Sequence, residues 1–100
     1  MMSETPIDLK GVRESEIDKE LLRVAIISEL DAINLYEQCA GSTKDADVKK
    51  VFADIIKEEK THVGEFQALL LTRDLEQREE LIHGDKEVDE LTGEGSEEED

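Results

Sequence analysis

Several features that mark other classes of protein are absent or rare in this 100-residue sequence. It has one cysteine, Cys39, which excludes an intramolecular disulfide framework and fits a reducing cytosol. No run approaches the roughly 18 consecutive apolar residues that a membrane-spanning helix needs, and the first six residues lack the basic and apolar regions of a signal peptide. No stretch alternates between apolar and polar residues as a half-buried strand does. We therefore expect a cytoplasmic, all-α protein that does not contact a membrane.

Basic residues are also scarce. The sequence has 12 Lys and Arg against 28 Asp and Glu, which gives a formal net charge of −16. Binding to duplex nucleic acid needs clustered Lys and Arg, so nucleic acid is not an expected partner. The length allows at most one small domain.

Charge and glycine content divide the chain into three parts. Residues 1–14 contain Pro6 and Gly11 in a polar stretch, so we expect a flexible N-terminus. Residues 15–92 form the predicted helical domain. Residues 93–100 form a predicted disordered tail, because five acidic residues fall within the last seven positions: Glu94, Glu97, Glu98, Glu99 and Asp100.

Two long helices are predicted in the middle of the chain. The first runs from about residue 16 to 40, with Ser15 as its N-cap and Gly41 as its C-cap. Asp45 or Asp47 caps the second, which runs from about residue 46 to 71. Because the connection between them is short, the two helices should form an antiparallel hairpin.

A shorter third helix is predicted after the hairpin. Asp74, with Gln77 three residues later, resembles a capping box at its start. We expect the helix to end near Gly84, with at most one further weak turn over residues 85–92.

The informative feature of the first long helix is a carboxylate on its apolar side. Beyond the first helical turn, Glu29 is the only charged residue on an apolar stripe that extends about 60° to either side of it. The stripe consists of Leu22, Ala25, Ile26, Ala32, Ile33, Tyr36 and Ala40.

The second long helix repeats this arrangement. Glu59 lies at the centre of its apolar stripe, and His62 lies one turn further along. The apolar members are Val48, Phe52, Ile55, Ile56, Val63, Phe66 and Leu70. Glu58 and Glu65 project about 100–120° from Glu59 and belong to the flank.

Burying two ionised carboxylates without compensation costs several kcal/mol each, and a small domain has only about 5–15 kcal/mol of net stability. No Lys or Arg between residues 20 and 70 lies on either stripe, so a metal ion is the simplest partner for Glu29, Glu59 and His62. Mixed carboxylate and imidazole ligands suit iron or manganese. Four-helix di-iron bundles use twice this ligand set, so we predict that a two-fold dimer closes a four-helix bundle and binds two metal ions.

Two segments resemble the encapsulated ferritin-like proteins, and most closely the archaeal type that is joined to the encapsulin shell protein. They are residues 26–36, which contain Glu29 and Tyr36, and residues 58–66, which contain Glu59 and His62. The resemblance covers residues 14 to 93. Glu-x6-Tyr on one helix with Glu-x-x-His on the next is its most specific feature.

The resemblance implies a ferroxidase that oxidises Fe(II) with dioxygen at a dimeric di-iron centre. Glu29, Glu59 and His62 would bind the metal, and Tyr36 would lie beside the centre. The resemblance also implies a ring-shaped decamer inside an encapsulin nanocompartment, where the shell stores the Fe(III).

Three alternatives remain open, of which a metal-free regulatory hairpin would need another partner for its buried acids. A rubrerythrin-like peroxide reductase would turn over faster with hydrogen peroxide, although it normally needs an electron-donating iron domain held by four cysteines, which the lone Cys39 cannot furnish. A helical assembly adaptor would use the metal only to lock an oligomer, without redox activity.

Overall fold

The computed structural model describes residues 8–95. By its contacts the chain divides into two compact units, Met1–Leu70 and Leu71–Asp100, which we describe separately. Residues 1–7 of the predicted flexible N-terminus and residues 96–100 of the predicted acidic tail lie outside the described residues. The segment-by-segment division of the chain therefore stays a prediction.

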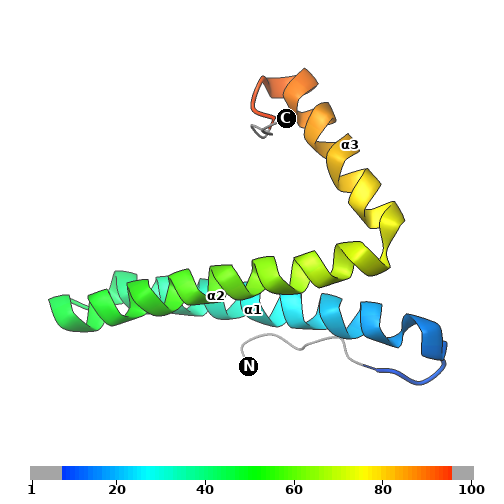
Figure 1. Cartoon of the computed structure of the whole chain (residues 1–100). Coiled ribbons are helices and arrows are strands. Elements are labelled where there is room, and N and C mark those ends of the chain that lie inside the picture. Colours follow the sequence, from blue (N-terminus) through cyan, green and yellow to red (C-terminus); the bar gives the residue numbers. More distant parts are fainter. Residues whose placement is uncertain (1–7, 96–100) are drawn as a thin grey trace. The chain divides into compact units, whose positions relative to one another are not determined.

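The described residues form helices and no strand, so the predicted all-α class is confirmed. The first unit holds a short 3-10 helix, the first long helix and most of the second, and the second unit holds the third helix (Figure 1). In chain order the elements are η1 (Glu14–Glu16), α1 (Ile17–Ser42), α2 (Ala46–Arg73) and α3 (Leu75–Thr92). None of the described helices combines the length and apolar character that a membrane span requires.

Helices α1 and α2 lie side by side and antiparallel, as predicted (Figure 1). Contacts along their length include the stacked rings of Tyr36 and Phe52, with centroids 5.9 Å apart, and the ion pair of Lys60 Nζ with Glu37 Oε1 at 3.9 Å. The turn between them is short because Asp45 caps α2 directly. Its Oδ1 accepts hydrogen bonds from the backbone N–H groups of Asp47 and Val48, at 2.9 and 3.1 Å.

The start of α1 differs from the prediction. Ser15 does not cap it, because Ser15 lies inside η1 and α1 begins after Glu16, which makes no side-chain capping hydrogen bond. The predicted cap of α3 is confirmed, since Asp74 Oδ1 accepts a hydrogen bond from Gln77 N at 3.0 Å.

Two glycines that were predicted to end helices lie inside them. Gly41 is part of α1, which continues to Ser42 and is capped by Thr43. Gly84 is part of α3, which continues to Thr92 and ends at Gly93 in the left-handed conformation with φ 77°. A helical glycine costs only about 1 kcal/mol relative to alanine, so neighbouring residues can carry a helix through it.

Gly41 and Gly93 should respond to alanine in opposite directions. A Cβ at Gly41 would meet nothing within 4 Å, so Gly41→Ala should raise the free energy of unfolding by about 0.5–1 kcal/mol. Gly93→Ala should lower it, because alanine is strained at positive φ. Denaturant unfolding of both variants checks this, and a destabilised Gly41→Ala chain would contradict the helical assignment.

The hairpin has almost no core of its own. Among the described residues, the only buried apolar side chains are Ile56 and Leu70, 9% and 5% exposed. Large apolar side chains are exposed along both helices: Leu21, Ile27, Leu30, Val48, Val51 and Leu69. A pair of helices that covers so little of its apolar surface needs further packing to be stable.

Candidate metal centre

Two of the three predicted ligand residues sit at the middle of a helix. Twelve residues of α1 precede Glu29 and thirteen follow it, and thirteen residues of α2 precede Glu59 and fourteen follow it. His62 lies three residues after Glu59, so its side chain projects from the same side of α2. Antiparallel packing of two helices of similar length therefore brings their midpoints, and these side chains, together.

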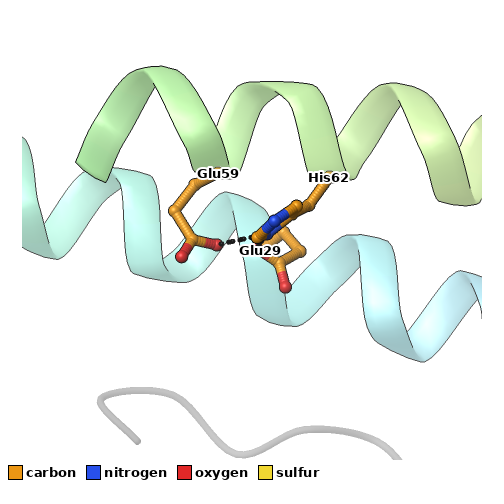
Figure 2. Close-up of side chains that lie close together, drawn as sticks. All are labelled: Glu29, Glu59 and His62. Atoms are coloured by element: carbon orange, nitrogen blue, oxygen red, sulfur yellow. Dashed lines mark ion pairs between the residues drawn. The ribbon is translucent and has the colours of Figure 1, made fainter. Parts of the chain in front are cut away.

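The structure brings these three side chains into one cluster, as predicted. His62 Nδ1 lies 3.4 Å from Glu29 Oε2 and 3.6 Å from Glu59 Oε2. Figure 2 shows His62 and Glu59 reaching from α2 toward Glu29 on α1. One ligand atom from each residue lies within 4.8 Å of the other two, and no other such group of His, Cys, Asp and Glu occurs in the part of the chain that the structure describes.

One carboxylate oxygen of this cluster has no hydrogen-bond partner. Glu29 Oε2 is buried and accepts no hydrogen bond from the described residues. His62 Nδ1 is close enough for an ion pair, but 3.4 Å is too long for a good hydrogen bond. Lys60, the lysine nearest to Glu59 in sequence, extends toward Glu37 instead. An unsatisfied buried carboxylate is costly, and a bound cation would remove that cost.

The donor set determines which cations fit. Two carboxylates and one imidazole offer two oxygen donors and one nitrogen donor, which suits iron or manganese better than a structural zinc site. Three protein ligands also leave coordination positions open. The cluster therefore has the composition of a reactive metal centre and lacks the closed ligand set of a structural one.

The hairpin alone only partly buries the cluster. The side chains of Glu29 and Glu59 are 21% and 19% exposed, and that of His62 is 46% exposed. The sequence pattern predicted all three on a buried face, and the exposure of His62 shows that one chain does not complete that face.

Tyr36 is not part of the cluster in this chain. It lies two helical turns from Glu29 along α1, about 10 Å by helix rise, where its ring stacks on Phe52 at an interplanar angle of 29°. Its predicted position beside a bound metal stays a prediction. The pairing of Glu37 with Lys60 was not predicted, because a sequence projection does not reveal which surface residues face each other across two helices.

Three comparisons place this chain among known proteins. Residues 20–98 match the family model described as Rubrerythrin. Over 74 residues the chain is 61% identical to the ferritin-like-encapsulin shell fusion protein of Pyrococcus furiosus. That match covers 74% of this chain but only 21% of the relative, so the chain spans about a fifth of that protein.

The fold matches a solved structure equally well. The crystal structure of the encapsulated ferritin domain from Pyrococcus furiosus is 50% identical, with a TM-score of 0.82 over 96% of this chain and 98% of that one. The resemblance to the encapsulated ferritin-like proteins that the two helical segments indicated is thus confirmed, and the chain belongs to the rubrerythrin family.

Proposed function

We propose that the protein is a ferroxidase whose centre forms between two copies of the chain. The observation that carries this proposal is the unpartnered, buried Oε2 of Glu29, within ion-pair distance of His62 and close to Glu59. The substrate is Fe(II), and each ion gives one electron to dioxygen. Glu29, Glu59 and the Nδ1 atom of His62 would hold the ions, and the carboxylates offset the charge that increases as Fe(II) becomes Fe(III).

A dimer is needed for the chemistry and for the packing. One chain supplies three ligand side chains, and a two-fold axis beside the cluster supplies six, which is the ligand count of a di-iron bundle. Exposed apolar side chains lie on the same side of the hairpin as His62, where the second hairpin would cover them: Leu21, Val51 and Leu69, which are 41%, 59% and 49% exposed. The same contact would therefore close the core and complete the ligand set.

The proposal extends to storage of the product. The relative from Pyrococcus furiosus is named as a fusion of a ferritin-like part with an encapsulin shell. We propose by analogy that this chain acts inside an encapsulin compartment in the cytoplasm, as a ring-shaped decamer, and that the shell retains the Fe(III).

Anaerobic titration with Fe(II), followed by native mass spectrometry, tests the shared centre. We expect two irons per dimer, with occupancy and dimer increasing together. The matched control is Glu58→Gln, which removes an exposed carboxylate next to Glu59 and should leave the stoichiometry unchanged. A stable dimer without bound iron, or one iron held by each separate chain, would contradict the proposal.

The match to the rubrerythrin family also supports a second candidate, a peroxide reductase. Both activities would use the same three residues, but they differ in the oxidant. Stopped-flow oxidation of the Fe(II)-loaded protein distinguishes them: a ferroxidase is fast with dioxygen, whereas a peroxide reductase is faster with hydrogen peroxide. Metal-dependent association without oxidation by either would identify an assembly adaptor.

A further inference from the structure

The chain turns back toward α3 where this helix ends. The helix stops at Thr92, because Gly93 takes the left-handed conformation and its backbone N–H donates a hydrogen bond to the carbonyl oxygen of Asp89 at 2.8 Å. From such an end a chain is free to continue in many directions. Here the next two residues are also held, and both groups that hold them are side chains of the last turn of α3.

Thr92 holds residue 94, and Asp89 holds residue 95. The hydroxyl of Thr92 donates a hydrogen bond to the carbonyl oxygen of Val88 at 2.8 Å and accepts one from the backbone N–H of Glu94 at 3.0 Å. The backbone N–H of Gly95 donates to Asp89 Oδ1 at 3.2 Å. This last bond joins residues six positions apart, so it folds the chain back along the helix. Three successive N–H groups after Thr92 therefore have acceptors in the last turn.

Gly95 lies so close to the helix that no larger residue fits. A Cβ atom at this position would lie 2.5 Å from Asp89 Cβ and 3.2 Å from the carbonyl oxygen of Asp85, and the helix fixes both of these atoms. Every other glycine that the structure describes has open space at the corresponding point. Gly95 does not have a positive φ, and it is partly buried although residues 91–94 are exposed. Contact with α3, and not backbone conformation, therefore requires glycine here.

The position of Asp89 is unfavourable for the helix itself. The C-terminal end of a helix carries a partial negative charge, which basic side chains stabilise and acidic ones do not. The last turn of α3 contains Asp89 and Glu90 but no basic residue. Aspartate is also one of the poorer helix formers. The hydrogen bond from Gly95 gives the carboxylate of Asp89 a role that helix formation does not explain.

We propose that Asp89 and Thr92 form a clasp that makes residues 93–95 part of the folded unit of α3. The chain then leaves this unit at Gly95, from a fixed point beside the last turn of the helix. Three residues of free chain would span about 10 Å, and the clasp removes that freedom. It therefore controls where, and in which direction, the following residues begin relative to α3. This role goes beyond the proposed function and requires no metal.

Amide exchange in the full, metal-free chain tests the clasp. Water-exchange NMR measures the rate at residue 95, and comparison with the rate of an unstructured chain of the same sequence gives its protection. Asp89→Ala should lower the protection of Gly95 by about 2–12-fold, the factor that one net hydrogen bond contributes. The matched control is Glu90→Ala, which removes the neighbouring exposed acid and should leave Gly95 protected. Unchanged protection in Asp89→Ala, or an equal loss in Glu90→Ala, would overturn the proposal.

Substitution of the glycine gives a second, independent test. Gly95→Ala should lower the protection of residue 95 to a similar extent, because the added methyl group would collide with Asp89. Gly84→Ala is its control, since a Cβ there meets nothing within 4 Å, and it should leave residue 95 protected. A Gly95→Ala chain that keeps the protection of residue 95 would show that these residues do not pack as a clasp, and the proposal would fail.

Discussion

Glu59→Ala should lower the rate of Fe(II) oxidation by at least about 100-fold. In the proposed centre Glu59 supplies one of only three ligand groups per chain, and its Oε2 lies 3.6 Å from His62 Nδ1. Replacing a residue that only supports a metal ligand lowers metal affinity or activity by about 10–100-fold. Loss of a ligand itself should lower activity at least as much. In the proposed two-fold dimer, the substitution removes two carboxylates from each centre. Oxygen consumption after anaerobic loading with Fe(II) measures the effect.

Two comparisons separate loss of function from loss of structure. Glu58→Ala changes the same residue type at an exposed neighbouring position and should oxidise iron at the unmutated rate. Glu29→Gln removes a charge whose buried Oε2 accepts no hydrogen bond, so the metal-free variant should unfold at the same or a higher temperature while it loses oxidation. A Glu59→Ala protein that oxidises Fe(II) at the unmutated rate would refute the assignment of the site.

Val51→Asp combined with Leu69→Asp should abolish the metal-sharing dimer, and iron oxidation with it. Both side chains are exposed on the His62 side of α2, at 59% and 49%. Burial of a Val or Leu side chain contributes about 1.5–3 kcal/mol, and two-fold symmetry doubles the loss to four side chains per dimer. The introduced carboxylates would also be desolvated. We expect native mass spectrometry to show the species with two irons falling at least about 100-fold.

The control for this variant is Leu75→Asp with Leu91→Asp, which places the same two charges at apolar side chains of α3 that are 62% and 84% exposed. It should leave oxidation and the metal-sharing dimer intact. If the double variant loses the dimer and keeps full oxidation, one chain suffices for the chemistry, and the proposal of a shared centre fails.

Most of the helical architecture could be predicted from local signals in the sequence. Asp45 and Asp74 cap helices because their short side chains accept hydrogen bonds from free backbone N–H groups. The errors occurred where the signal was weak. Gly41 and Gly84 were read as helix ends, although a glycine without positive φ is only a small penalty inside a helix. The helix-ending glycine with the left-handed conformation is Gly93, which was not predicted to end a helix.

The candidate site could be predicted in composition but not in exposure. Glu29 and Glu59 interrupt apolar stripes. Because a carboxylate on a buried stripe is costly, these two residues, together with His62, could be identified as candidate ligands. A helical projection of the sequence assumes that each apolar stripe packs against another element. It does not say whether that element belongs to the same chain. The 46% exposure of His62 and the two-residue core show how much of that cover one hairpin does not supply. Tyr36 illustrates the same limit, because in a single chain its ring stacks on the ring of Phe52.

The central position of Glu29 and Glu59 bears on how long the ligand geometry persists. Helices open first at their ends, where hydrogen bonds break and reform most often. About three turns of helix protect each carboxylate on either side. Backbone amides near these residues should exchange with deuterium most slowly in the hairpin, so fraying at the termini of α1 and α2 can proceed without displacing the groups proposed to hold the metal.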